Sequence, residues 1–185
     1  MSKIRITGGE WRSRLVQVMD AQGLRPTPDR VRETLFNWLG QDLAGWRCLD
    51  LFAGSGILGF ECASRGAAEV VLVERDPGVF ARLRQNAASL DQEGGRLQPL
   101  RADALEFAFA AAQQSNAGHG FDLILLDPPY GHGWLERVTP LLPALARPDA
   151  LIYAEAEHRI ESLGDWRVRK QGQAGQVHYH LLERA

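Results

Sequence analysis

Apolar residues along most of this chain gather in short runs that alternate with amphipathic stretches. Five of these runs are candidate strands, and they span residues 47–52, 69–74, 97–101, 121–127 and 150–155. Most of the five are almost continuously apolar, as in strands buried on both faces of a parallel sheet. After Pro77, one face of a helical stretch carries Val79, Phe80, Leu83, Ala87 and Leu90. Strands that alternate with helices in this way predict an α/β fold with a parallel sheet.

The C-terminal part of the chain has a different pattern. Residues 166–169 and 176–182 flank a turn that contains Gly172 and Gly175, and they predict an antiparallel hairpin that closes the sheet. Residues 113–120 are polar and predict a loop.

The N-terminal part predicts a hairpin followed by a helix. Ile4 and Ile6 precede a Gly-Gly pair, residues 15–18 supply a second short strand, and Pro28 is expected in the first turn of a helix that ends at Leu39. We therefore expect residues 1–40 to form an extension that packs on a core of residues 41–185, with no linker between them.

Composition limits the class of protein. The chain has 185 residues, of which 45% are hydrophobic and 24% charged, as in one folded globular domain. No apolar run is long enough to cross a membrane, and the first residues lack a signal-peptide pattern, so a cytoplasmic location is expected. The two cysteines form no CxxC pair and the five histidines show no ligand spacing, so the sequence predicts neither a disulfide nor a metal site.

Charge is distributed unevenly along the sequence. The formal net charge is −2, yet residues 1–38 hold seven basic and four acidic residues, a net charge of +3 that leaves −5 for the remainder. A basic arm on an acidic body suits binding to the phosphates of a nucleic acid. A solvated face of unpaired arginines would give the same pattern, and this alternative stays open.

A glycine-rich turn follows the first strand of the expected core. Gly54, Ser55 and Gly56 let the backbone approach a ligand closely, although such glycines also serve tight packing of a strand against a helix. The turn lacks the Lys-Ser/Thr ending of a phosphate loop, and Asp50 just before it would repel a phosphate. The methionyl ammonium group of S-adenosylmethionine fits Asp50 better, and its carboxylate fits the helix N-terminus. We also assign Phe52 to this expected cofactor site.

Carboxylates also end the second and third strands. Glu74 is placed to accept hydrogen bonds from both ribose hydroxyls of the cofactor, and a solvated strand end is the alternative. Asp103 is placed to accept from the adenine amino group or to cap the following helix, and both roles are compatible. Their neighbours Arg75 and Ala104 are included in the expected cofactor site.

The most specific motif, Asp127-Pro128-Pro129-Tyr130, ends the fourth strand. Two consecutive prolines cannot donate backbone hydrogen bonds, so this strip leaves the sheet with its carbonyls directed outward. Asp127 and the Pro128 carbonyl can then both accept from one NH₂ group, such as the exocyclic amine of a nucleobase, and Tyr130 can stack on the base. A strand-ending turn without chemistry is the alternative. All four motifs follow successive strands, where open parallel sheets bind ligands.

With these residues in view, the chain resembles the class I methyltransferases, and among them the bacterial 16S ribosomal RNA guanine-N2 methyltransferases of the RsmD type. The stretches that carry the resemblance are residues 9–14, 24–37, 49–59, 64–67 and 127–130. The resemblance implies a Rossmann-like, mostly parallel seven-stranded sheet and an N-terminal hairpin that grips RNA. It also implies methyl transfer from S-adenosylmethionine to N2 of guanine 966 in 16S ribosomal RNA, during assembly of the small subunit, by a protein that we expect to be a monomer.

Arginines in the N-terminal arm are the candidate RNA contacts, and they are Arg5, Arg12, Arg14, Arg25, Arg30 and Arg32. We expect the stretch around Thr27 to cover the cofactor or to clamp the RNA backbone. A salt-bridged helix start is the alternative reading of the same residues.

Three rival functions remain at the level of sequence. An adenine-N6 methyltransferase of DNA or RNA would use the same strip, and a glutamine-directed protein methyltransferase is chemically close. A non-catalytic RNA-binding module for ribosome assembly is the rival of a different class. The rigid double acceptor at Asp127 and Pro128 argues against a pure binding module.

Overall fold

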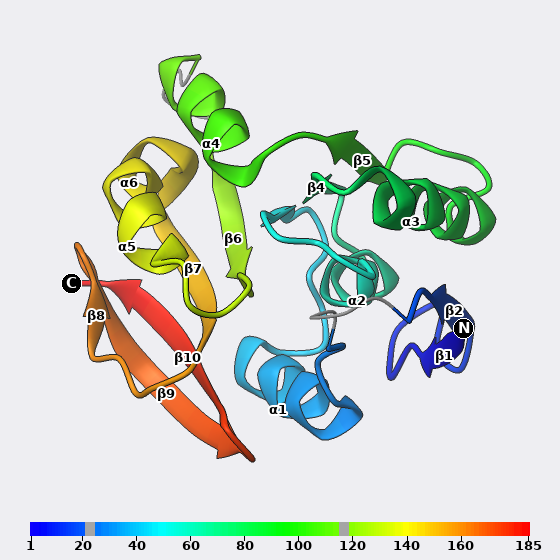
Figure 1. Cartoon of the computed structure of the whole chain (residues 1–185), viewed down its shortest axis with the longest axis horizontal. Helices are drawn as coiled ribbons and strands as arrows, with labels where there is room; N and C mark the ends of the chain where they lie inside the picture. The colour runs from blue at the N-terminus through cyan, green and yellow to red at the C-terminus, as the bar shows by residue number, and fades with distance from the viewer. Residues whose placement is uncertain (21–24, 115–118) are drawn as a thin grey trace.

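A mixed sheet of eight strands forms the centre of the molecule (Figure 1). The computed structural model describes residues 1–20, 25–114 and 119–185. The strand order is β5-β4-β3-β6-β7-β10-β9-β8. The strands are β3 (Arg47–Asp50), β4 (Glu69–Glu74), β5 (Leu97–Arg101), β6 (Phe121–Leu126), β7 (Ala146–Ala156), β8 (Ser162–Leu163), β9 (Trp166–Ala174) and β10 (Val177–Arg184).

The expected Rossmann-like fold is confirmed, with one addition at an edge of the sheet. Strands β3 to β7 pair in parallel, and β10 and β9 continue the sheet as the predicted antiparallel hairpin. These are the seven expected strands. The eighth, β8, is two residues long and pairs with β9, so the expectation of seven strands missed a short edge. The hairpin strands are also longer than predicted, because Gly172 lies within β9 against the ring of Tyr179.

Helices cover both faces of the sheet. One face carries α1 (Asp29–Leu39), α2 (Ile57–Ser64) and α3 (Pro77–Leu90), and the other carries α4 (Ala104–Gln113), α5 (Trp134–Val138), the short 3₁₀ helix η1 (Thr139–Leu141) and α6 (Leu142–Leu145). Neighbouring strand residues alternate between the two apolar clusters: Cys48 packs with the first set of helices and Leu49 with the second. Part of the predicted polar loop, residues 115–118, lies outside the described residues.

The N-terminal extension packs directly on the core. Strands β1 (Ser2–Arg5) and β2 (Leu15–Val18) form a separate two-stranded sheet. Ile6, Trp11 and Val16 are buried in the same apolar cluster as Phe36 of α1 and Phe60 of α2. Residues 1–40 therefore share the hydrophobic core of the rest of the chain. Helix α1 begins at Asp29, one residue later than expected, with Pro28 as its N-cap residue.

A buried ion cluster fastens this extension to α2. Glu61 accepts hydrogen bonds from Arg32 Nη1 at 2.6 Å, from Arg65, and from the backbone nitrogen and hydroxyl of Thr7 at 2.8 and 2.9 Å. Arg32 also donates to the carbonyl oxygens of Thr27 and Arg5. The expectation that Arg32 contacts RNA is wrong, because its side chain is fully buried and paired. Its charge holds together the start of α1, the hairpin and α2.

Within the described residues, no helix combines the length and the apolar character needed to cross a bilayer.

Candidate active site

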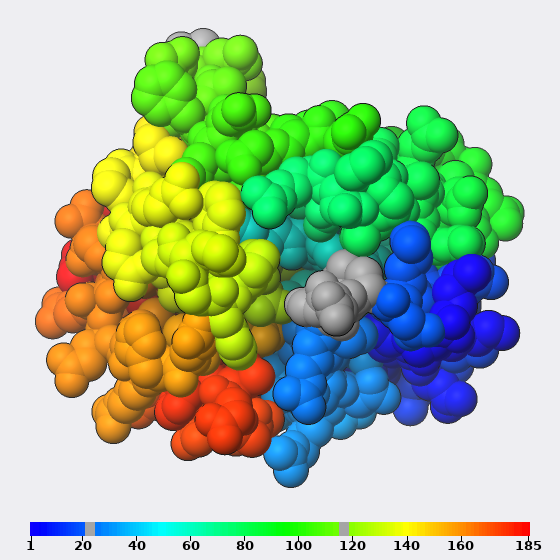
Figure 2. Space-filling model, in the orientation of Figure 1, coloured from blue at the N-terminus to red at the C-terminus, as the bar shows by residue number. Residues whose placement is uncertain are grey.

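The Asp127–Tyr130 strip leaves the sheet at the carboxyl end of β6, as predicted. Strand β6 ends at Leu126, Asp127 is half-buried, Pro128 is buried and Tyr130 is exposed. The yellow-green residues that follow β6 border a recess near the centre of the face shown in Figure 2. The exposed ring of Tyr130 is therefore accessible to a planar base.

Behind the strip, Asp127 belongs to a cluster of carboxyl groups. Its side chain hydrogen bonds Glu155 at the end of β7 and Thr27 before α1. The Thr27 hydroxyl donates to Glu155 Oε1 at 2.9 Å, and the Tyr153 hydroxyl donates to the same oxygen at 2.8 Å. Loss of water around Asp127 and the charge of Glu155 raise the pKa of Asp127 well above its usual range. Burial raises the pKa of Glu155 as well.

Asp50 lies beneath the glycine turn. Its carboxylate accepts a hydrogen bond from the backbone nitrogen of Gly59 at 3.1 Å, and only 1% of the residue is exposed. Burial, together with the negative charges of Glu74 and Glu155, raises the pKa of Asp50 to about 7, and the hydrogen bond from Gly59 opposes this rise. Asp50 thus supports α2 through the backbone of Gly59. Its predicted contact with the cofactor ammonium group remains a prediction.

This raised pKa makes stability depend on pH in a defined direction. The pKa of Asp50 is about 7 in the folded state and near 4 in the unfolded state. Its contribution to the free energy of unfolding is fully present below about pH 4 and is lost as the pH rises through about 7. We expect the stability of the wild type to fall relative to Asp50→Asn over this window, by at most about 1.4 kcal/mol per pH unit. Urea unfolding of both proteins at several pH values measures the difference; parallel curves would contradict it.

Glu74 and Asp103 keep acceptor capacity for a ligand. Glu74 accepts from the backbone nitrogen of Gly54 at 3.0 Å through one oxygen and from that of Asp76 at 2.8 Å through the other, which leaves a second lone pair on each. Asp103 caps α4 through Oδ1 alone, and its Oδ2 forms no hydrogen bond with the described residues. Two carboxylates with spare lone pairs fit the ribose diol and the adenine amino group of S-adenosylmethionine.

Aromatic side chains flank the turn, and one of them was missed in the sequence. Phe52 meets Trp134 of α5 edge to face, with ring centroids 5.6 Å apart, and Arg75 lies 6.0 Å from the Trp134 ring centre. The indole nitrogen of Trp134 is buried without a hydrogen-bond partner in the described part of the chain. Trp134 follows a Gly-His-Gly segment that carries no ligand-binding pattern, so no sequence signal pointed to it.

The remaining predicted cofactor residues lie around the same turn. Gly54 and Gly56 both adopt positive φ, at 53° and 83°, which glycine tolerates and other residues rarely adopt. Gly56 also has no room for a side chain, since a Cβ atom would lie 2.4 Å from Leu83. The Ser55 hydroxyl accepts from the backbone nitrogen of Ile57 at 3.3 Å, and Ala104 is the buried first residue of α4. The glycines therefore serve both the turn and its packing, and the two sequence readings are compatible.

Comparison with known proteins decides the family. A family model described as Conserved hypothetical protein 95 matches residues 4–183. The chain belongs to this family. It is 40% identical over 187 residues to ribosomal RNA small subunit methyltransferase D of Escherichia coli strain K12, with 98% of this chain and 90% of the relative covered. The Haemophilus influenzae protein of the same name is 38% identical over 185 residues, with coverage of 98% and 94%.

Solved structures agree with this assignment. The structure described as putative methyltransferase yhhF from Escherichia coli matches with a TM-score of 0.83 and 40% identity, over 99% of this chain and 98% of that one. An rRNA methyltransferase, aviRa from Streptomyces viridochromogenes, has the same fold at 17% identity, with a TM-score of 0.63 over 90% and 88% of the two chains. The expected family and enzyme class are confirmed: this chain is a methyltransferase with the class I fold.

In this family member, most of the expected RNA-binding arginines lie on the surface of the N-terminal arm. The exposed ones are Arg5, Arg12, Arg14, Arg25 and Arg30. Arg14 donates to the carbonyl oxygen of Ser89 at 2.9 Å and thereby joins the hairpin to α3. The positive charge of Arg25 opposes the rise in the pKa of Tyr130, which places Arg25 beside the strip. Thr27 is buried and its hydroxyl donates to Glu155, so it belongs to the carboxyl cluster; its expected place in the cofactor site remains a prediction.

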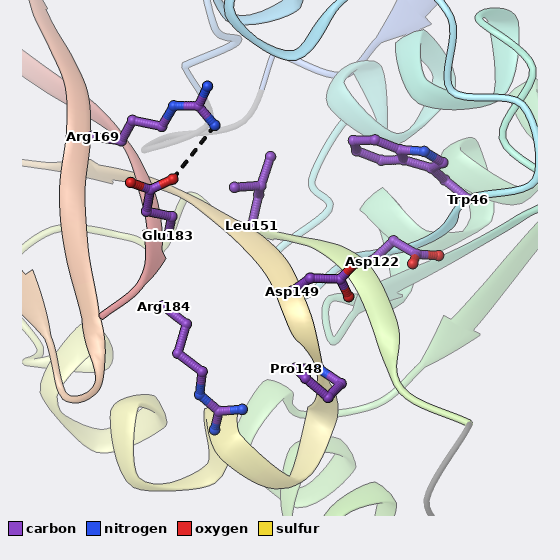
Figure 3. A pocket seen from close by; sticks show the side chains of 8 residues that line it. All are labelled: Trp46, Asp122, Pro148, Asp149, Leu151, Arg169, Glu183 and Arg184. Atoms are coloured by element: carbon purple, nitrogen blue, oxygen red, sulfur yellow. Dashed lines mark ion pairs between the residues drawn. The ribbon is translucent and has the colours of Figure 1, made fainter.

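A cavity of about 380 Å³ lies away from these motifs, at the amino ends of β6 and β7 (Figure 3). Its walls are polar, and an ion pair between Arg169 and Glu183, 3.5 Å apart, closes one side. It is lined by Trp46, Asp122, Pro148, Asp149, Leu151, Arg169, Glu183 and Arg184. None of the predicted catalytic, cofactor or RNA residues is among them. The predicted site therefore lies at the converging strand ends, away from this cavity.

Proposed function

We propose that this chain transfers a methyl group from S-adenosylmethionine to N2 of guanine 966 in the 16S ribosomal RNA of the small subunit. The observation that carries the proposal is the position of Asp127 and Pro128 directly after β6, at the same edge of the sheet as the carboxylates expected to hold the cofactor. The Escherichia coli and Haemophilus influenzae relatives are named as small subunit ribosomal RNA methyltransferases, which supports ribosomal RNA as the substrate class. Such a substrate implies work in the cytoplasm on assembling subunits.

S-adenosylmethionine is the methyl donor, and it supplies an electrophilic methyl group on a positively charged sulfur. Glu74 holds the ribose hydroxyls and Asp103 the adenine amino group. The acidic cluster formed by Asp50, Asp127 and Glu155 favours a cationic ligand over a phosphate. The chain's own residues therefore bind the donor by charge and hydrogen bonding, without a metal.

The substrate amine needs help because its lone pair is conjugated into the base and is a poor nucleophile. Asp127 and the Pro128 carbonyl accept its two N–H bonds, which favours a pyramidal nitrogen with the lone pair directed at the methyl group. Tyr130 offers its exposed ring to the base. Catalysis then comes mainly from positioning for in-line transfer, and Asp127 takes up the proton that the amine loses.

The substrate itself can be identified directly. We would incubate the protein with labelled S-adenosylmethionine and either naked 16S ribosomal RNA or assembling small subunits, and then map the labelled base. Label on guanine N2 at position 966 is the expected result. Label on adenine N6 would favour the rival methyltransferase, and binding of RNA without label would favour the non-catalytic module.

Replacing Arg12, Arg14 and Arg30 together by alanine is expected to weaken RNA binding without changing cofactor affinity. Each phosphate contact that is lost should lower the slope of log K against log salt by about 0.7–0.9. Filter binding at several salt concentrations measures this slope. Triple replacement of Arg84, Arg167 and Lys170, which are exposed outside the arm, is the charge-matched control. Equal losses of RNA affinity in the two triple variants would show that the arm has no special role in RNA binding.

A further inference from the structure

Glu155 is a buried titratable group that the mechanism above leaves unused. It ends an apolar stretch of β7, the neighbour of β6, and only 4% of it is exposed. Every contact described for its carboxyl group is a hydrogen bond: to Thr27, to Tyr153 and to Asp127. One side of this carboxyl group therefore faces the core, and the other faces the catalytic strip.

The hydrogens available in this cluster are too few for two ionised carboxylates. Thr27 and Tyr153 each carry one hydroxyl hydrogen, and both hydroxyls donate to Glu155 Oε1. The contact between Asp127 and Glu155 joins two acceptors unless a proton lies between them. Two like charges in contact within a buried site cannot both persist, so the pair retains one proton.

We propose that Glu155 is a positioning residue that shares one proton with Asp127 and turns the other oxygen of Asp127 toward the substrate amine. This inference rests on the proposed methyl transfer and adds a residue to it. Thr27 ties the pair to the start of the N-terminal arm, because its backbone carbonyl accepts from Arg32 at 3.1 Å. The position of the arm is thereby coupled to the orientation of Asp127.

Protons balance in the proposed step. The amine nitrogen forms a bond to the methyl group as the carbon–sulfur bond breaks, and the electron pair of that bond stays on sulfur. The methylated nitrogen then gives one proton to the free oxygen of Asp127, while the shared proton moves fully onto Glu155. The pair changes from one proton and one negative charge to two protons and no charge. It returns the extra proton to water through the part of Asp127 that stays exposed.

Other charged and titratable groups face this pair from several elements. Asp50, at the end of β3, faces both carboxyl groups, and Tyr130 of the strip and Tyr153 of β7 face them as well. Glu157, which follows β7, and Arg25, before α1, face Tyr130. The negative charge of Asp50 favours retention of the shared proton.

Titration of the free enzyme tests the shared proton without any RNA. In protein labelled with ¹³C at carboxyl carbons, the wild-type pair should titrate in two separate steps, whereas Asp127 should titrate in a single step in Glu155→Gln. The last proton of the wild-type pair should leave at higher pH than the proton of Asp127 in the variant, because the negative charge of the pair opposes this second ionisation. An unchanged titration of Asp127 would overturn the proposal. This readout stands even if ribosomal RNA is not the substrate, so failure of the proposed function and failure of this inference are distinguishable.

Kinetics test the positioning role. Glu155→Gln should lower kcat by roughly 10–100-fold, below the full effect of a lost general base, with little change in KM. It should also move the acidic limb of the pH profile to higher pH, because the shared proton no longer stabilises the ionised oxygen of Asp127. Tyr153→Phe is the matched control, since it removes one hydrogen bond to Glu155 Oε1 and leaves both carboxyl groups in place. If Tyr153→Phe loses as much activity as Glu155→Gln, and neither variant shifts the pH profile, Glu155 is only a structural support.

Discussion

Replacement of Asp127 by alanine is expected to lower kcat by roughly 10²–10⁴-fold while cofactor affinity stays near that of the wild type. The variant loses an acceptor for the substrate amine and the group that takes up its proton. Glu74 and Asp103, which are assigned to the cofactor, lie on other strand ends and keep their hydrogen bonds. Calorimetry with S-adenosylmethionine and single-turnover methyl transfer measure the two effects separately.

Stability gives this experiment an internal control. In the wild type, the Asp127–Glu155 pair keeps one negative charge in a buried site near Asp50, which burial and the neighbouring charges disfavour, as the raised pKa of Asp127 indicates. Removal of Asp127 lets Glu155 keep its own proton and relieves this cost, so Asp127→Ala should unfold at a urea concentration no lower than the wild type does. Simultaneous loss of cofactor binding, activity and stability would show a damaged fold and would contradict the assigned role.

Much of the fold could be predicted because burial leaves a periodic signature in the sequence. Most strands of the parallel sheet are apolar on both faces, and one of them, β4, has the predicted bounds. The more polar edge strand β5 also has its predicted bounds. Short elements were harder to predict. Strand β8 has two residues and α6 has four, too few to complete a period that distinguishes them from loops. Both depend on contacts made by longer neighbours.

The candidate site could be predicted where a side chain follows a strand at the carboxyl edge of the sheet. Asp103 and Asp127 are such residues. Glu155 had the same signal, since it closes the apolar run of residues 150–155, but it lacked a motif around it. Arg32 was misassigned because its pattern is that of a surface charge. Its burial depends on Glu61, which lies 29 residues away in a different helix.

Replacement of Glu61 by alanine is expected to destabilise the protein by about 3–5 kcal/mol. The change leaves the guanidinium groups of Arg32 and Arg65 buried without their shared carboxylate, and it removes the acceptor for the backbone nitrogen and hydroxyl of Thr7. A buried unpaired charge costs far more than a broken surface pair. Urea unfolding, analysed by linear extrapolation, measures the free energy of unfolding.

The matched control is Glu69→Ala, which breaks an ion pair with Arg47 whose two side chains keep about a quarter of their surface exposed. Its cost should not exceed about 1 kcal/mol. Because Glu61 joins α2 to the hairpin and to the start of α1, its loss should also release residues 1–40 from the core before global unfolding. Limited proteolysis should then cleave the hairpin of Glu61→Ala faster than that of Glu69→Ala. Equal free energies and equal cleavage in the two variants would show that the apolar contacts of Ile6, Trp11 and Val16 hold the arm without the ion cluster.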